Sequence, residues 1–353
     1  MNPLIYSFLV PFVVSLVLIP ILVAVCNKLK LFDLPNQRKV HKHSIPRLGG
    51  TVFMPAMLLG MITGLSFEVG FNETVALQPS TLFMILGAIM IYAIGILDDL
   101  HGLGAKLKFV VQFVAALILP LCNLYIDDMH GLLFMHQLPT WASYLITVFV
   151  IILVVNAINL IDGIDGLASS LSILILLAFA YLFYQLEATM FVLLALSLAG
   201  SVVAFFIYNV FGHLGKNKIF MGDTGSLFLG YVIAYMAVKY QMSNGLFPYR
   251  ESSLLISYTL LIVPTFDLTR VAFARLLKHK SIFDADKTHI HHRIMDMGLS
   301  MHVALVIILL LFVVFCGLNY LLYQNGIQFT LILIADIALY SLFIFMTGKL
   351  RRG

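Results

Sequence analysis

Residues 155–170 read VNAINLIDGIDGLASS, an apolar stretch that carries a polar side chain at every third position, namely Asn156, Asn159, Asp162 and Asp165. Polar and ionisable groups at membrane depth are unfavourable unless they face a cavity or a partner, so they indicate a functional site. Three residues turn an ideal α-helix by about 300°, so the side-chain direction drifts by about 60° at each step. On a continuous helix Asp165 would therefore point away from Asn156.

Two glycines in the same stretch resolve this conflict. Gly163 and Gly166 each follow an aspartate, and glycine allows the backbone to leave the helical conformation. Irregular backbone at membrane depth is tolerated where it is buried in protein or lines a cavity. We therefore expect the helix to end or unwind here, so that the polar groups converge on a pocket that forms the floor of an active site.

The rest of the chain is strongly apolar. It has 353 residues, of which 61% are hydrophobic and 11% are charged, whereas a soluble domain averages about 25% charged residues. Its mean hydropathy is +1.02, and apolar runs long enough to cross a bilayer recur along its whole length. We predict one all-α polytopic membrane domain over residues 1–353, with eleven transmembrane spans at 4–26, 48–66, 80–97, 107–125, 141–159, 169–186, 188–209, 222–240, 253–272, 301–323 and 328–348.

The distribution of basic residues predicts the orientation. Lys28 and Lys30 follow the first apolar run, which places the N-terminus outside and the next loop in the cytoplasm. Of the 21 Lys and Arg residues, all but Lys239 and Arg250 then lie in or beside the cytoplasmic segments. These segments are 27–47, 98–106, 160–168, 210–221, 273–300 and the C-terminal tail. The clusters of unusual polar residues fall on the same side, so the active site is expected at the cytoplasmic face.

The net charge and the three cysteines say less about function than these motifs do. The net charge of +4 suits anionic lipid headgroups or an anionic substrate. Cys26, Cys122 and Cys316 lie apart within apolar runs, which predicts packing residues and neither a disulfide framework nor a thiolate metal site.

Two adjacent carboxylates, Asp98 and Asp99, end the third predicted span. Adjacent side chains on a helix point about 100° apart, so the two cannot have the same role. One could act as a base or metal ligand while the other braces it, and a close carboxylate pair favours a bound cation. Lys108 follows at the next helix start, where phosphate binding and snorkelling to the interface would explain it equally well.

The segment KIFMGDTGSLFLG at 218–230 places Asp223 at the start of a span. Asp223, Thr224 or Ser226 could cap that helix. The neighbouring glycines match the two Asp-Gly pairs at 162–163 and 165–166, however, and carboxylate and amide oxygens are the ligands that Mg²⁺ prefers.

The segment DADKTHIHHR at 284–293 holds Lys287, three histidines (His289, His291 and His292) and Arg293. It contains neither an HExxH pattern nor cysteines, so a basic flap over phosphates suits it better than a zinc site. Asp267 and Arg270, three residues apart on the ninth span, are expected to pair with each other. Together these clusters predict metal-assisted transfer of a phosphate group to or from a lipid.

Other functions compete with this prediction. An ion-coupled secondary transporter would place its polar groups near span centres, whereas these cluster at one end. A lipid phosphotransferase with a CDP-alcohol donor shares the Asp-Gly pairs but requires an Arg-containing continuation after Gly166, which is missing. A purely structural membrane protein would leave the carboxylate clusters unexplained.

Four motifs in this order and spacing resemble the polyprenyl-phosphate N-acetylhexosamine-1-phosphate transferase family. They are IGILDDLHGLGAKLKFVVQ (94–112), NAINLIDGIDGLASS (156–170), KIFMGDTGSLFLG (218–230) and HIHHR (289–293), and the resemblance begins at RKVHKHSIPRLGG (38–50). The branch that uses UDP-MurNAc-pentapeptide has a differently arranged histidine motif. The sequence is more similar to the bacterial enzymes that start O-antigen, enterobacterial common antigen or teichoic acid linkage synthesis.

The resemblance implies transfer of an N-acetylhexosamine-1-phosphate, most simply GlcNAc-1-phosphate, from a UDP-sugar to undecaprenyl phosphate, with release of UMP. It implies Mg²⁺, for which Mn²⁺ can substitute, a multi-pass location in the bacterial inner membrane, and a homodimer. By position, Asp98 would be the base or nucleophile supported by Asp99, and Asp223 and Asn159 would hold the metal. Lys108 would bind phosphate, Asp165 would contact uracil, and Asp162 and Asn156 would shape the same pocket. The segment with His289, His291, His292 and Arg293 would lie over the sugar and diphosphate.

The residues leave two mechanisms open, in which Asp98 either deprotonates the lipid phosphate or forms a covalent phosphoryl-enzyme. Because the second pKa of a phosphate is about 6, a strong base is unnecessary at neutral pH. We therefore favour direct attack by the lipid phosphate.

Overall fold

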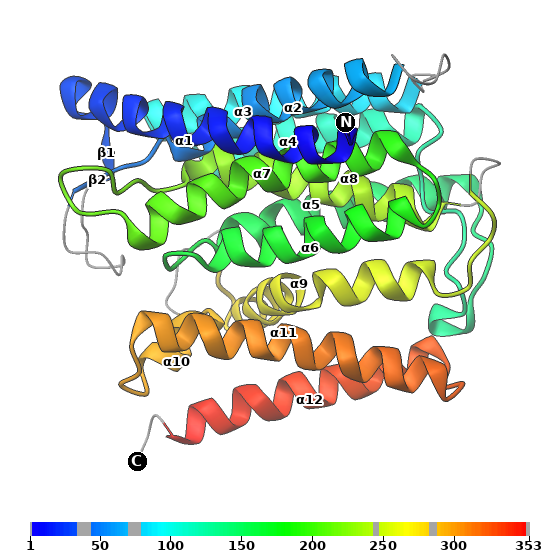
Figure 1. Cartoon of the computed structure of the whole chain (residues 1–353). Coiled ribbons are helices and arrows are strands. Elements are labelled where there is room, and N and C mark those ends of the chain that lie inside the picture. The colour runs from blue at the N-terminus through cyan, green and yellow to red at the C-terminus, as the bar shows by residue number, and fades with distance from the viewer. Residues whose placement is uncertain (1, 34–43, 70–78, 243–246, 282–287, 351–353) are drawn as a thin grey trace.

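The computed structural model describes residues 2–33, 44–69, 79–242, 247–281 and 288–350. Its long helices lie side by side in one bundle (Figure 1). In the described residues, helices of 17 residues or more lie at all eleven predicted positions: α1 (Pro3–Leu29), α2 (Phe53–Val69), α3 (Pro79–His101), α4 (Ala105–Leu121), α5 (Thr140–Ile161), α6 (Leu167–Tyr184), α7 (Thr189–Phe211), α8 (Gly222–Gln241), α9 (Ser253–Leu277), α11 (Met301–Gln324) and α12 (Phe329–Leu350).

Short elements connect the helices. Strands β1 (Phe32–Asp33) and β2 (Ile45–Pro46) form a small antiparallel pair before the 3₁₀ helix η1 (Gly49–Val52). A second 3₁₀ helix, η2 (Leu132–Phe134), precedes α5, and α10 (Ile290–Met295) precedes α11. Figure 1 places β1, β2 and α10 at the same end of the bundle.

Eight helices of the described chain are long and apolar enough to cross a membrane, which makes this a multi-pass membrane protein. They are α1, α2 with η1, α3, α5, α6, α7, α11 and α12. The count of eleven spans and the orientation stay predictions. Helix α8 is not among these eight helices. Every residue from Thr224 to Gln241 is buried, so this helix is surrounded by protein and needs no apolar surface for lipid.

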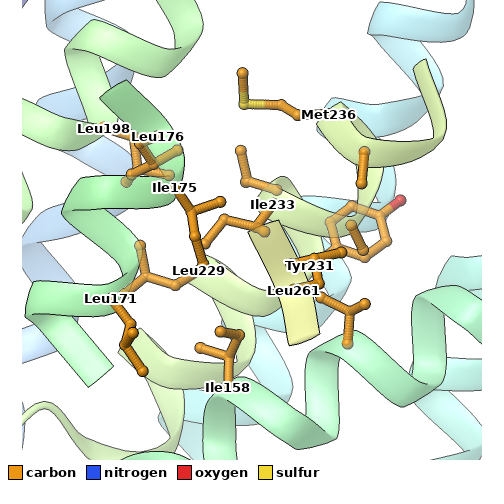
Figure 2. Packing of buried hydrophobic residues seen from close by; sticks show 14 of the residues in the cluster. Ile158, Leu171, Ile175, Leu176, Leu198, Leu229, Tyr231, Ile233, Met236 and Leu261 are labelled. Atoms are coloured by element: carbon orange, nitrogen blue, oxygen red, sulfur yellow. The ribbon is translucent and has the colours of Figure 1, made fainter. Parts of the chain in front are cut away.

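Helix α8 is the centre of the core. It contacts α3, α5, α6 and α9, and Figure 2 shows its Leu229 and Ile233 among side chains from α5, α6, α7 and α9. Gly230 allows α5 to approach closely, since a Cβ at this position would lie 2.7 Å from the Cα of Val155. This contact fixes the polar end of α5 beside the start of α8.

Helix α3 extends past the predicted end of the third span at residue 97. It continues to His101, because Asp98 accepts hydrogen bonds from the following turn, at Oδ1 from Leu103 N–H (2.7 Å) and at its carbonyl from Gly102 N–H (2.7 Å). Only residues 102–104 separate α3 from α4. Both carboxylates of the Asp98–Asp99 pair therefore lie on the last turns of a helix, with fixed directions.

Helix α9 is bent. Pro264 lies inside it, and a proline removes one backbone hydrogen bond and clashes with the preceding turn. Figure 1 shows the second half of α9 turned across the direction of the bundle. The bend brings Asp267 and Arg270 to the start of α10, where they bond the histidine segment.

Candidate active site

Four helix ends meet at one place: the C-terminal ends of α3 and α5 and the N-terminal ends of α4 and α8. Lys108 Nζ lies 3.1 Å from Asp98 Oδ2 and 2.5 Å from Asp223 Oδ2. Asn159 Nδ2 lies 3.2 Å from Asp223 Oδ1 and 2.8 Å from Ser226 Oγ. The structure thus brings together Asp98, Lys108, Asn159 and Asp223, which come from three separate sequence motifs.

Asp99 has a different role from its neighbour. It is only 4% exposed, and it accepts hydrogen bonds from Asp223 N–H (2.9 Å), Thr224 N–H (3.0 Å) and the Thr224 hydroxyl (2.6 Å). Asp99 therefore caps α8 from α3. The alternative that Asp223, Thr224 or Ser226 caps the helix is wrong, since no such side-chain bond is present and Ser226 donates to the Gly222 carbonyl.

Gly222 makes this capping contact possible. Its φ is +74°, and a Cβ would lie 2.5 Å from Asp99 Oδ2. An L-residue would be strained at this φ and would also displace the Asp99 carboxylate. The Met-Gly-Asp sequence therefore serves to seat Asp99 against the start of α8.

The neighbours of Lys108 explain why a cation lies near the start of α4. A cation in the first turn of a helix is disfavoured by the helix dipole, but here the ammonium group bridges two carboxylates of α3 and α8. Both contacts are partly buried, with 21% of the Lys108 side chain exposed. The ammonium group lies in the position that a cation shared by Asp98 and Asp223 would take.

The donor set fits Mg²⁺. The described residues contain no group of three or more His, Cys, Asp or Glu side chains that could hold a metal. Magnesium, however, is usually bound by one or two carboxylates together with water and substrate phosphates. Asp98 and Asp223 supply two carboxylates around one cation position, and the Asn159 amide lies against Asp223. These residues would complete their site with phosphate oxygens.

The predicted interruption of the helix is confirmed. Helix α5 ends at Ile161 and α6 begins at Leu167, so residues 162–166 form a turn at the site. Asp165 Oδ2 lies 2.5 Å from Lys218 Nζ, which also bonds the Asn209 carbonyl. Burial and the nearby Asp165 raise the pKa of Asp162 to about 7.

Asn156 points toward α4, where its Nδ2 donates to Gln112 Oε1 at 2.6 Å. Sequence reasoning missed Gln112, although it lies four residues after Lys108 on an apolar helix. Residues four apart share a helix face, so this spacing was a usable signal. Lys218 was not singled out as a site residue, although it opens the motif at 218–230, and no local pattern marks Asn209.

The histidine segment packs on the α5–α6 turn. His291 is 2% exposed, and its ring fills the space in which a Cβ of residue 163 would lie. Neither ring nitrogen has a hydrogen-bond partner among the described residues, and burial lowers the His291 pKa to about 3. The His292 ring centroid lies 4.3 Å from that of His291. Lys287 lies outside the described residues.

Two members of this segment contact other helices. His289 Nδ1 lies 2.7 Å from Asp267 Oδ2, and Arg293 donates to the Ile344 carbonyl of α12 at 2.8 Å. The expected pair of Asp267 and Arg270 is confirmed at 2.8 Å. Arg293 therefore contacts α12.

Comparisons with known proteins identify the family. A model of glycosyl transferase family 4 matches residues 81–241. A probable undecaprenyl-phosphate N-acetylglucosaminyl 1-phosphate transferase of Bacillus subtilis (strain 168) is 34% identical over 314 residues, which cover 88% of this chain and 83% of that protein. An undecaprenyl-phosphate alpha-N-acetylglucosaminyl 1-phosphate transferase of Haemophilus influenzae is 31% identical over 305 residues, or 86% and 81% of the two chains. The protein of the same name from Escherichia coli (strain K12) is 25% identical over 294 residues, or 81% and 75%. The chain therefore belongs to glycosyl transferase family 4, among the undecaprenyl-phosphate N-acetylglucosaminyl 1-phosphate transferases, which are membrane phosphotransferases.

Proposed function

We propose that this protein transfers GlcNAc-1-phosphate from UDP-GlcNAc to undecaprenyl phosphate with Mg²⁺, releases UMP, and thereby starts a lipid-linked cell-envelope polysaccharide. We place this activity at the cytoplasmic face of the bacterial inner membrane. The relatives' names support the acceptor and the transferred group. The observation that carries the proposal is the Asp98–Lys108–Asp223 cluster at four converging helix ends, which suits the handling of two phosphates.

The reaction brings two anions together, so positive charge must offset their repulsion. Mg²⁺ held by Asp98, Asp223 and Asn159 would supply Lewis-acid stabilisation of the phosphate oxygens. It would take the place that the Lys108 ammonium group now has between the two carboxylates, and Lys108 would then be left to neutralise a phosphate. Of the adjacent pair, Asp98 has 13% of its side chain exposed whereas Asp99 is only 4% exposed, so we assign Asp98 and not Asp99 to the lipid phosphate. Asp99 has both carboxylate oxygens bonded to α8 and holds Asp223 in place.

We favour direct attack of the lipid phosphate on the sugar-linked phosphorus, with UMP as the leaving group. At neutral pH most of the lipid phosphate has already lost its second proton, so Asp98 need only help to orient it and accept that proton from the minority of molecules that still carry it. Exchange of labelled UMP into UDP-GlcNAc in the absence of lipid would show a covalent phosphoryl-enzyme instead.

A cavity of about 1070 Å³ between α5, α9 and α12 supports a prenyl-chain acceptor. Its lining is mostly apolar and includes the side chains of Arg270 and Arg293. An apolar cavity with cationic groups matches a lipid with a phosphate head. The apolar lining includes Leu153, Phe266, Phe273, Ile337, Ile344 and Phe345.

Filling this cavity should weaken acceptor binding selectively. Ile337→Trp is expected to raise the KM for undecaprenyl phosphate about tenfold, since about 1.4 kcal/mol of lost binding is tenfold in affinity, and to leave the KM for UDP-GlcNAc unchanged. Steady-state kinetics with each substrate varied would measure both constants. The control is Leu342→Trp on the same helix, at a residue that is 54% exposed and does not line the cavity. Equal shifts in both variants would exclude the cavity as the acceptor site.

A methyl group on Gly163 should displace His291. Gly163→Ala is expected to lower kcat/KM for UDP-GlcNAc about a hundredfold, because a misplacement of about 1 Å near a reacting group can have an effect of this size. Gly317→Ala is the matched control, since a Cβ at that glycine would meet no described atom within 4 Å beyond its chain neighbours and its own helix backbone. A Gly163→Ala enzyme with normal kinetics would show that the contact between His291 and the turn is unimportant for turnover.

The decisive experiment offers the purified protein a panel of UDP-N-acetylhexosamines with undecaprenyl phosphate, with Mg²⁺ and with EDTA, and measures UMP. We expect UMP with UDP-GlcNAc and Mg²⁺ and none with EDTA. Turnover of another UDP-sugar in preference would correct the donor, and turnover in EDTA would remove the metal from the mechanism. Absence of UMP with every donor would reject the proposal.

A further inference from the structure

The Asp267 carboxylate lies at the centre of a buried network that joins α9 to the histidine segment. It is 1% exposed. Its Oδ1 accepts from Arg270 Nη2 at 2.8 Å and from Ile290 N–H at 3.0 Å, and its Oδ2 lies 2.7 Å from His289 Nδ1. Tyr340 of α12 adds a weaker contact at 3.4 Å.

Two of these contacts fix the start of α10. His289 is the residue before the helix, and its own side chain makes no capping bond. The N–H of Ile290, which has no partner within the helix, instead donates to Asp267 of α9. Asp99 accepts from the first N–H groups of α8 in the same way. Arg270 bonds both Asp267 and the Thr288 carbonyl, so the backbone is held on each side of His289.

The same carboxylate selects the tautomer of His289. An ionised carboxylate paired with arginine only accepts hydrogen bonds, so the proton between it and His289 belongs on Nδ1 of the imidazole. Nε2 is then the nitrogen left available to accept a hydrogen bond or a proton.

The network continues to the α5–α6 turn. The ring of His289 is parallel to that of His291, with centroids 5.9 Å apart and an interplanar angle of 6°, and the His291 ring lies against Gly163. The position of α10 therefore sets the position of two histidines relative to Asp162 and Asp165.

We propose that Asp267 is a positioning residue for the transfer reaction: it holds the start of α10 against the α5–α6 turn and keeps His289 protonated on Nδ1. The kinetic part of this inference rests on the proposed function. The tautomer does not, because it is a property of the protein without substrate.

The first test is spectroscopic. Protein labelled with ¹⁵N-histidine in detergent micelles would give long-range ¹H–¹⁵N spectra at neutral pH, and the loss of one signal in His289→Gln would assign that residue. We expect a proton on Nδ1 of His289 in the wild type and the Nε2–H tautomer in Asp267→Asn, whose amide can donate to Nδ1. Asp267→Glu keeps the carboxylate and is expected to keep the Nδ1 proton. A wild-type Nε2–H tautomer, or the same tautomer in Asp267→Asn, would overturn the proposal.

The second test is a double-mutant cycle on UMP release. Asp267→Asn is expected to lower kcat about 10- to 100-fold, the size of the effect when a metal-ligating histidine loses the carboxylate that orients it, but to have little further effect in a His289→Gln background. Full additivity would mean that Asp267 does not act through His289. Asp336→Asn is the control, since this α12 carboxylate is equally buried and bonded by Tyr258 and Asn319. If the wild type releases no UMP, the proposed function fails, whereas the tautomer measurement still decides the role of Asp267.

Discussion

Asp98→Asn is expected to lower UMP release about a thousandfold without changing the thermal unfolding midpoint of the protein. The asparagine Oδ1 can still accept from Leu103 N–H, and Lys108 keeps its 2.5 Å contact with Asp223. The end of α3 therefore stays intact. What is lost is one of two carboxylates around the shared cation position, and removing one preorganised electrostatic contact typically lowers kcat about 10²- to 10³-fold.

Two measurements decide this prediction. UMP release at saturating substrates gives the loss of turnover, and thermal unfolding in detergent micelles gives the stability. Asp127→Asn is the matched control, because Asp127 lies in the loop that follows α4, at the opposite end of that helix from Lys108. If Asp98→Asn kept more than a tenth of wild-type turnover, the Asp98 carboxylate would be dispensable to the reaction.

The positions of the long helices along the chain could be predicted from the sequence, because they rest on local patterns. Apolar runs gave the helix positions, and the Asp-Gly pairs predicted the break after Ile161 that the structure shows. The burial of α8 could not be predicted in this way. Hydropathy reports how apolar a helix is, not whether lipid or protein covers it, and residues 224–241 of α8 are all buried in protein.

The pairing of side chains could not be predicted either. Asp99 bonds the start of α8, and Asp267 bonds the start of α10. In each pair the two residues lie far apart in the sequence, so no local sequence pattern indicates the contact. The rotation of α3 about its axis and the position of α8 beside it decide which of the two carboxylates bonds α8 and which is left for the reaction. The sequence permitted either assignment for Asp98 and Asp99, whereas the structure distinguishes them by burial and by bonding partners.

Asp99→Asn, the same chemical change one residue further along α3, is expected to have a different outcome. An amide has one acceptor oxygen where the carboxylate has two, so its NH₂ group would face one of the three donors from Asp223 and Thr224. A buried donor left without an acceptor costs about 1–3 kcal/mol, and a donor facing another donor adds repulsion. We expect the free energy of unfolding to fall by about 3 kcal/mol and UMP release to fall with it, because Asp223 would leave its place beside Lys108.

Thr224→Val provides the graded control for Asp99→Asn. This change removes one of the three donors and leaves both backbone bonds in place, so about 1 kcal/mol of stability should be lost while most of the turnover is kept. Stability and turnover measured together show whether Asp99 supports the structure or takes part in the reaction. An Asp99→Asn protein that unfolds at the wild-type temperature but releases no UMP would mean that Asp99 takes part in the reaction itself. An unstable protein with wild-type turnover at low temperature would mean that Asp223 keeps its place without this cap. Only the joint loss of stability and turnover fits a buried carboxylate that acts by holding Asp223 at the start of α8.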